Sequence, residues 1–448
     1  MLKYFFTEEN EIPNLEPIRT DRIKRLKIAS AVCWLIMVAA QIYMAYTFNG
    51  AQTSDAAIYL KFAKQVLTEG LLYPSTTNIH DIYIFGNGYV NYIAFILGIS
   101  HSIRTIYFIN VLWTQLLLFA CIFIVRKILP DTLAEYYLVI LFSLFNVFWA
   151  ETVLLRTELV FTSLCFSAIA LMFSTVKGKH IFGGILIGLA NWIRPLGIVF
   201  LIGAVIASVY KQNKIKKAIP LVVSYVCIIA IIGGITYLSC GHFIYQASTS
   251  GYNMFMTAND EADGSYMDVF GEGQPGYIPE EKRENMLYSD FNDYYTEMSV
   301  KWILQNPLKY ISLFPAKIFY LFATETYSGG AFLNNETATG GKDYLTGLLH
   351  KLNGTSNEAL HVGDVLTMFN QAWYMGIMLL FAIGFVLILK KHLWRRFLPL
   401  FAVFVLGTGM TIAVVAGARY HFPYLPIFLI VAAYTFSRID AQKSKPAG

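Results

Sequence analysis

Long runs of apolar residues constrain this chain more than any other feature of its sequence. A helix that crosses a bilayer needs roughly 20 predominantly apolar residues, and most of these runs reach or approach that length. The run at 181–209 exceeds it and lies between two basic segments, so we expect a hairpin with its tip at 191–195. The sequence therefore predicts about ten spans. The runs occupy residues 28–48, 103–125, 133–150, 159–176, 181–209, 219–239, 368–389, 397–416 and 422–436.

The composition indicates the same class of protein. Of the 448 residues, 56% are hydrophobic and 14% are charged, whereas a soluble domain carries about 25% charged residues. We therefore predict an all-α integral membrane protein, a polytopic helical bundle with helices and loops on its external surface. The net charge of +5 is spread over short loops, so it bears on orientation in the membrane and does not indicate nucleic-acid binding.

Basic clusters between the apolar runs predict how the chain is oriented. Because lysine and arginine favour the cytoplasmic side, we expect both termini in the cytoplasm of a multi-pass plasma-membrane protein. The shorter run 82–99 would then lie along the outer surface, since a crossing there would place Arg126 and Lys127 outside. The basic clusters lie at 19–27, 126–127, 177–179, 211–217, 390–396 and 438–445.

This topology divides the chain into regions. Residues 1–27 form a cytoplasmic tail, and 28–239 form an N-terminal transmembrane module with a first outer loop at 49–102. Residues 240–367 form an external loop with interfacial helices, including a half-apolar piece at 302–322. Residues 368–448 form the C-terminal transmembrane helices and a cytoplasmic tail.

The first outer loop contains an aspartate directly after the first span. Ile58, Phe62 and Val66 recur every four residues and Gly70 follows, so residues 54–69 are expected to form an amphipathic helix on the membrane surface. Asp55 lies in its first turn, facing the space between loop and bilayer. The alternative is that Asp55 only caps the helix, where a carboxylate is favoured by roughly 0.3–1 kcal/mol.

A second external patch carries Glu151, Arg156 and Glu158 at the boundary of a span. Charges this close to hydrocarbon are costly, and they are usually functional or paired. The alternative to a functional role is a local pair between Arg156 and a glutamate at a helix end.

Lone cations interrupt three other apolar stretches. Arg194 lies at a helix break before Pro195, where it either lines a cavity or reaches the surface. Lys317 lies in an apolar helix and is expected to extend to the interface. Arg419 and His421 occupy the external end between the last two spans, where an interfacial anchor is the alternative. Carboxylates and cations on one face suit deprotonation of a hydroxyl and stabilisation of an anionic leaving group, and they suit transport less well.

The order of these patches resembles the GT-C superfamily of polyprenyl-phosphate-dependent glycosyltransferases. The likeness is strongest to bacterial relatives of protein O-mannosyltransferases and of lipid A aminoarabinose transferases. Each motif is short, but their order and topology match through most of the chain. The motifs are Ser54-Asp55 with Tyr59, Gly98-Ile-Ser100 before Arg104, Arg156-Thr-Glu158, Arg194-Pro195, Asn306-Pro307 followed by Lys317, and 417–426 with Arg419 and His421.

The resemblance implies a function outside the membrane. A sugar would pass with inversion from a polyprenyl-phosphate-linked donor in the bilayer to a hydroxyl of an envelope glycan, glycolipid or protein. Asp55 matches the family's base position, and Glu158 stands at an acidic position in the second loop where an aspartate is usual. A divalent metal near Asp55 and Glu158 is a possible cofactor, although no metal-binding motif is present. Because they lie alone at the external membrane boundary, we expect Arg194 or Arg419, with Lys317 as the weaker candidate, to bind the donor phosphate. The expected substrate contacts are Tyr59, Arg156 and His421.

Other functions fit the same hydropathy pattern. A transporter or flippase for lipid-linked glycans would need a path through the membrane lined by polar residues. A polysaccharide polymerase or ligase would be expected to centre on a large loop rich in arginine and histidine. The sequence shows neither feature clearly.

Overall fold

The structure, a computed structural model, describes residues 20–130, 132–212, 215–326, 329–332, 347, 349–355 and 360–443. Every regular element in these residues is a helix, which confirms the predicted all-α class. The outer parts of both predicted tails, residues 213–214 of the basic segment 211–217 and parts of the external loop 240–367 lie outside the described residues.

Except for 133–150, each apolar run coincides largely with one helix or, for 181–209, with two. Helix α9 ends at Ile193 and α10 begins at Gly197, which confirms the hairpin. Six helical stretches in the described part are long and apolar enough to cross a membrane. The bundle helices are α2 (Thr20–Thr47), α5 (Ile103–Ile128), α6 (Ala134–Ser143), α7 (Val147–Ala150), α8 (Thr157–Phe173), α9 (Lys179–Ile193), α10 (Gly197–Gln212), α11 (Ile219–Cys240), α19 (Val362–Lys390), α20 (Trp394–Val414) and α21 (Leu425–Lys443).

The expected span at 133–150 is broken into α6 and α7. Side chains replace the helical hydrogen bonds lost at the break: the Asn370 amide oxygen accepts from the Val147 N–H at 3.0 Å, and the Trp149 indole donates to the Ser143 carbonyl at 2.8 Å. Because a helix can break inside a bundle only where other groups satisfy its backbone, this interruption depends on a residue of α19.

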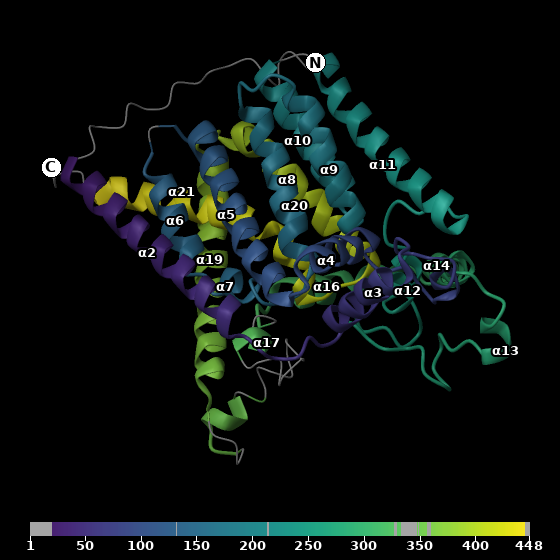
Figure 1. Ribbon diagram of the computed structural model, residues 1–448. Helices are drawn as coiled ribbons and strands as arrows, with labels where there is room; N and C mark the ends of the chain where they lie inside the picture. Colours follow the sequence, from purple (N-terminus) through teal and green to yellow (C-terminus); the bar gives the residue numbers. More distant parts are fainter. Residues whose placement is uncertain are drawn as a thin grey trace.

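Most of the remaining helices gather at one end of the bundle (Figure 1), whereas η2 (Ile215–Ala218) lies at the other end. We call this group the external layer, after the side of the membrane on which the sequence analysis places it. Helix α3 spans Asp55–Glu69 and ends at Gly70 in the left-handed region (φ 68°), as the spacing predicted. The apolar piece 302–322 is bent at Asn306–Pro307 into successive short helices. The layer comprises α3 (Asp55–Glu69), α4 (Asn87–Ser100), α12 (Ser250–Phe255), α13 (Glu280–Arg283), α14 (Tyr288–Gln305), α15 (Pro307–Ser312), α16 (Phe314–Phe322), α17 (Gly329–Phe332) and η3 (Ala418–Tyr424).

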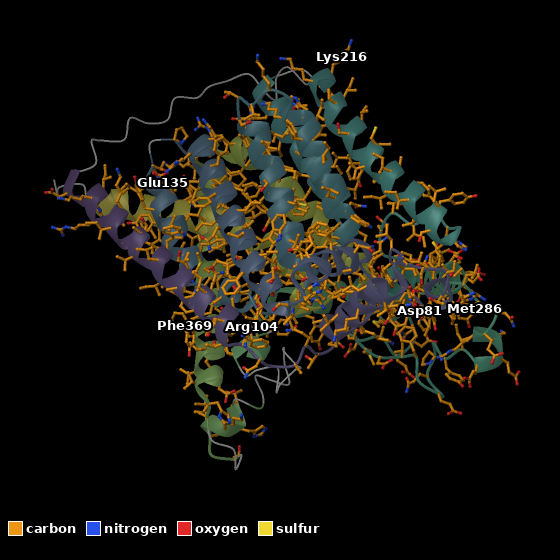
Figure 2. All side chains as sticks on the ribbon, viewed as in Figure 1. Asp81, Arg104, Glu135, Lys216, Met286 and Phe369 are labelled. Atoms are coloured by element: carbon orange, nitrogen blue, oxygen red, sulfur yellow. The ribbon has the colours of Figure 1, made fainter. Side chains whose placement is uncertain are left out.

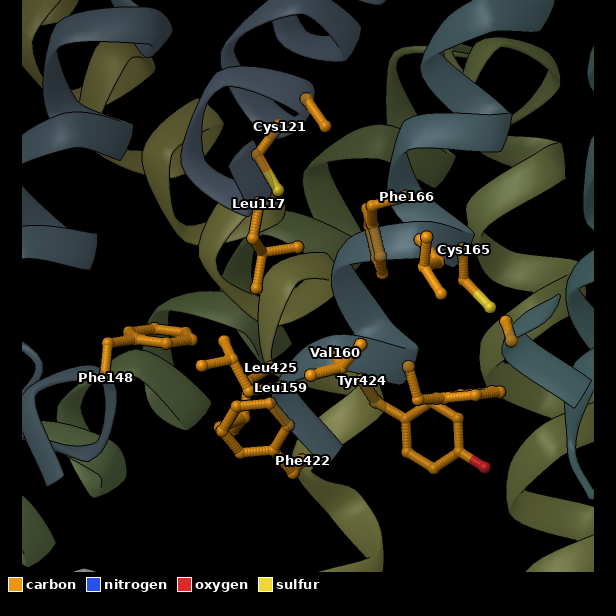
Figure 3. Packing of buried hydrophobic residues seen from close by; sticks show 14 of the residues in the cluster. Leu117, Cys121, Phe148, Leu159, Val160, Cys165, Phe166, Phe422, Tyr424 and Leu425 are labelled. Atoms are coloured by element: carbon orange, nitrogen blue, oxygen red, sulfur yellow. The ribbon is translucent and has the colours of Figure 1, made fainter. Parts of the chain in front are cut away.

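Helices α8 and α21 form the centre of the core. Nearly all side chains of α8 are buried, and α21 is apolar and buried along most of its length. Figure 3 shows Leu159 and Val160 of α8 packed near Phe422 of η3 and Leu425 at the start of α21. The first turn of α8 and the residues before α21 therefore meet at the end of the bundle that faces the external layer.

The basic segment around Lys216 and the external layer lie at different ends of the molecule. Lys216 lies at the end opposite the external layer, whereas Asp81 and Met286 belong to that layer (Figure 2). We predict that a membrane-impermeant maleimide labels Asp81→Cys on intact cells and labels Lys216→Cys only after permeabilisation, in a background without the native cysteines.

The reciprocal pattern, with Lys216→Cys labelled from outside, would reverse the orientation. Equal labelling of both positions on intact cells would contradict the separation of the two ends.

Candidate active site

Four charged side chains from distant parts of the chain meet beside the external layer. Asp55 begins α3, Glu158 lies in the first turn of α8, Arg194 follows α9, and Arg419 lies in η3. Asp55 and Arg419 are 364 residues apart in sequence yet share a hydrogen bond. We call these four residues the charged cluster.

Glu158 is the centre of the charged cluster. Its side chain is only 1% exposed, and Oε1 accepts from Arg194 Nη1 at 2.6 Å and from Arg419 Nε. Its Oε2 accepts from Arg419 Nη2 at 3.2 Å and from the Thr157 hydroxyl at 3.2 Å. Arg419 therefore binds Glu158 with two nitrogens, the geometry in which a guanidinium holds a carboxylate most firmly.

Arg419 also connects Glu158 to Asp55. Its Nη1 donates to Asp55 Oδ2 at 2.5 Å, and the two side chains are 19% and 37% exposed. Solvent exposure therefore increases across the charged cluster: the Glu158 carboxylate is buried, the Arg419 guanidinium is partly buried, and the Asp55 carboxylate reaches solvent. Asp55 is the carboxylate that an incoming molecule can contact.

The residue before Asp55 has an unusual backbone conformation. Ser54, the N-cap residue, has φ 53° and ψ −135° and makes no side-chain capping bond. A non-glycine residue in such a region costs on the order of 1–3 kcal/mol and is held there by its surroundings. The Asp55 carboxylate binds an arginine of another element, so helix capping alone does not account for this residue.

Arg194 is positioned by a close approach of α4 to the end of α9. A Cβ on Gly88 would lie 2.7 Å from the Trp192 carbonyl carbon, so only glycine permits this contact. Arg194 itself is extended, and its guanidinium lies 5.2 Å from the ring centre of Tyr420. Stacking on the aromatic ring and the ion pair to Glu158 together fix the orientation of this cation.

Tyr59 packs beside the charged cluster. It lies one turn after Asp55 on α3, is 5% exposed, and meets Tyr89 edge-to-face at 5.2 Å. Burial raises the pKa of its hydroxyl, and the nearby carboxylates act in the same direction. Tyr59 is therefore a neutral packing residue at the site, and its role as a substrate contact stays a prediction.

Arg156 pairs locally with Glu151, which is the alternative to a functional role that the sequence analysis gave for it. Its Nη1 lies 3.2 Å from Oε1 of Glu151, whose side chain is 2% exposed. Burial raises the pKa of Glu151 to about 7, against the opposing effect of Arg156. Arg156 lies two residues before Glu158 along the chain, so this pair borders the charged cluster.

Lys317 and His421 bind protein groups instead of joining the charged cluster. Lys317 is fully buried and donates to the Ile412 carbonyl at 3.0 Å, so it does not extend to the interface. His421 contacts Glu325 through Nε2 at 2.6 Å. Glu325 was missed by the sequence analysis, although a lone carboxylate directly after an apolar helix is a signal that could have found it.

The charged cluster does not fit a divalent cation between Asp55 and Glu158. Both oxygens of Glu158 and Oδ2 of Asp55 accept from guanidinium groups, so positive charge is already present where an ion would bind. Within the described residues, no group of three or more histidine, cysteine, aspartate or glutamate side chains is arranged to hold a metal.

Comparison with protein-family models and with curated proteins finds no match in either set. Among solved structures, the chain is similar to the apo oligosaccharyltransferase of Archaeoglobus fulgidus, with a TM-score of 0.49 and 11% identity over 93% of this chain and 51% of that one. It is also similar to the oligosaccharyltransferase AglB of that organism in complex with an inhibitory peptide and a dolichol-phosphate, with a TM-score of 0.46 and 12% identity over 92% and 50%. The chain spans about half the length of these proteins, and at these values we draw no functional conclusion from the likeness.

The pairing of Glu158 predicts unequal effects on stability. Glu158→Gln removes the carboxylate that Arg194 pairs with and leaves Arg419 with Asp55 alone, and breaking a buried pair costs about 3–5 kcal/mol. Asp55→Asn removes a half-exposed partner, for which about 0–1 kcal/mol is expected. Thermal unfolding in detergent should therefore show a much larger decrease in Tm for Glu158→Gln. Equal decreases for the two variants would contradict Glu158 as the centre of the charged cluster.

Proposed function

We propose that this protein is a membrane glycosyltransferase with Asp55 as its general base. It moves a sugar from a polyprenyl-phosphate donor to a hydroxyl of an envelope glycan, glycolipid or protein on the outer face of the plasma membrane. The observation that carries the proposal is the exposure of Asp55, at 37%, next to Arg419 and the buried Glu158. The resemblance of the motifs to GT-C glycosyltransferases supports the same assignment.

The proposed reaction is a single displacement at the anomeric carbon of the donor sugar. Asp55 takes the proton of the acceptor hydroxyl, and the acceptor oxygen forms a bond to the anomeric carbon. The bond between that carbon and the phosphate oxygen breaks, so the lipid phosphate leaves with the electron pair and the configuration is inverted. A general base in this position contributes roughly 10²–10⁴-fold to the rate.

Glu158 does not compete with Asp55 for this role. Its side chain is 1% exposed, and its oxygens are held by Arg194, Arg419 and Thr157. A carboxylate that accepts several charged hydrogen bonds is a poor proton acceptor because those bonds favour its ionised form. We assign Glu158 to holding the arginines.

The charge balance of the cluster favours departure of the phosphate. Two arginines and two carboxylates are neutral together, and the cluster becomes positive by one charge when Asp55 is protonated. The phosphate gains negative charge in the same step, so the two changes stabilise each other in a site of low dielectric constant. A guanidinium has five N–H donors, which allows Arg194 and Arg419 to bind Glu158 and still approach a phosphate. Lys317, fully buried and bonded to protein groups, is not part of this assignment.

The class of donor can be tested without knowing the acceptor. We expect mass spectrometry of the detergent-purified protein to detect a co-purified polyprenyl phosphate carrying a sugar. Arg194→Ala should reduce its amount relative to bulk phospholipid, because a phosphate contact is lost. If the wild-type protein carries no such lipid, the assignment of the donor is contradicted. If the lipid is equally abundant in wild type and Arg194→Ala, the role of Arg194 is contradicted.

The role of Asp55 is tested by Asp55→Asn, which preserves shape but cannot accept a proton. We expect the initial rate of transfer from a polyprenyl-phosphate sugar to fall by about 10²–10⁴-fold, with the Tm close to that of wild type. Glu69→Gln, at the other end of α3, is the matched control and should retain activity. Near-normal transfer by folded Asp55→Asn would remove Asp55 from the mechanism.

A further inference from the structure

The carboxyl end of α20 is held by side chains from the external layer. A helix leaves its last four carbonyls without intrahelical partners. Here Lys317 Nζ donates to the Ile412 carbonyl at 3.0 Å, and the Tyr310 hydroxyl donates to the Ala413 carbonyl at 2.6 Å. The Thr257 hydroxyl donates to the Val414 carbonyl at 2.7 Å. Three consecutive carbonyls are therefore satisfied from outside the helix.

Lys317 is the charged member of this group. Its side chain is 0% exposed, and its ammonium also donates to Thr257 Oγ1 at 3.0 Å and lies 4.6 Å from the centre of the Tyr310 ring. A cation at the carboxyl end of a helix matches the negative end of the helix dipole. Its directed contacts are with the protein, which indicates a structural use of this charge.

The chain leaves α20 and reaches Arg419 five residues later. We call residues 415–421 the Arg419 segment. At its far end, His421 Nδ1 donates to the Leu321 carbonyl at 2.7 Å, and Nε2 contacts Glu325 Oε2 at 2.6 Å. The His421 ring also stacks on Tyr374 at 5.0 Å with an interplanar angle of 14°.

Both ends of the Arg419 segment are thus held by one stretch of the external layer. Tyr310 belongs to α15, Lys317 and Leu321 belong to α16, and Glu325 follows directly. We propose that α15 and α16 brace the Arg419 segment, with Lys317 and His421 as positioning residues that hold Arg419 between Asp55 and Glu158. In this arrangement Lys317 and His421 contact neither donor nor acceptor.

This proposal rests on the proposed function only for its effect on transfer. Reacting groups displaced by about 1 Å can cost on the order of 100-fold in rate, and Arg419 contacts both carboxylates of the cluster. Loss of the brace should therefore lower kcat. Its effect on the backbone is independent of any activity.

Hydrogen–deuterium exchange of the full-length protein in lipid nanodiscs tests the brace directly. We expect Lys317→Met to increase exchange in peptides covering the Arg419 segment roughly tenfold, because the end of α20 then opens locally. Peptides from α9 and α10 should be unchanged. Lys309→Met is the matched control, since this α15 lysine donates to the Asp260 carbonyl and not to α20. Tyr310→Phe, which removes one hydroxyl, should give a smaller increase and serves if Lys317→Met does not fold.

The transfer assay adds a second readout. Lys317→Met should lower kcat about tenfold or more with little change in the KM for the polyprenyl-phosphate donor, and Lys317→Arg, which keeps a cation, should recover most of the rate. Unchanged exchange of the Arg419 segment in both folded Lys317→Met and Tyr310→Phe would overturn the brace even if transfer is confirmed. Increased exchange in a protein without any transferase activity would support the brace and refute the proposed function.

Discussion

The burial of Glu158 is the constraint on which the rest of the site depends. Moving a carboxylate out of water costs several kcal/mol unless opposite charges and hydrogen bonds replace the solvent. Here the replacement comes from Arg194, after α9, and from Arg419, just before α21. Glu158 of α8 therefore binds both the end of the N-terminal hairpin and the segment before the last helix. Asp55 joins the charged cluster through Arg419, so the first turn of α3 is connected to the same carboxylate.

The two carboxylates are alike chemically and differ in their surroundings. Glu158 is enclosed by donors, and Asp55 shares a single arginine and remains half-exposed. Such a pair separates a fixed charge from a reactive one, which is a common way for proteins to assign roles to similar groups. The arginines are held before any substrate arrives, so little reorganisation is needed when charge moves from the acceptor to the phosphate.

Polar groups around the charged cluster support its geometry indirectly, by holding the backbone that carries Arg419. Lys317 and His421 have the residue types expected of substrate contacts, yet both are buried against backbone carbonyls. In a membrane protein, broken helices must have their free backbone groups satisfied by the protein itself. The external layer supplies these partners, and the mobility of Arg419 is limited as a consequence. Charge near a membrane boundary can thus stabilise a backbone as readily as it binds a ligand.

The sequence by itself determined the features that depend on neighbouring residues. Apolar runs located the helices of the bundle, Pro195 marked the hairpin, and the spacing of Ile58, Phe62 and Val66 predicted α3 to within a residue, because hydropathy and helical periodicity are local properties. The sequence also selected the members of the charged cluster: Glu158, Arg194 and Arg419 by their place next to apolar runs, and Asp55 by its place directly after the first span and its match to the family's base position. Only the tertiary structure decided how they pair, since Arg419 reaches Asp55 across 364 residues. It also decided the break between α6 and α7, which depends on Asn370 at a separation of 223 residues. The contact of Lys317 with the end of α20 was likewise decided by the tertiary structure. Contacts of this kind depend on how helices pack in three dimensions, and no local pattern in the chain encodes them.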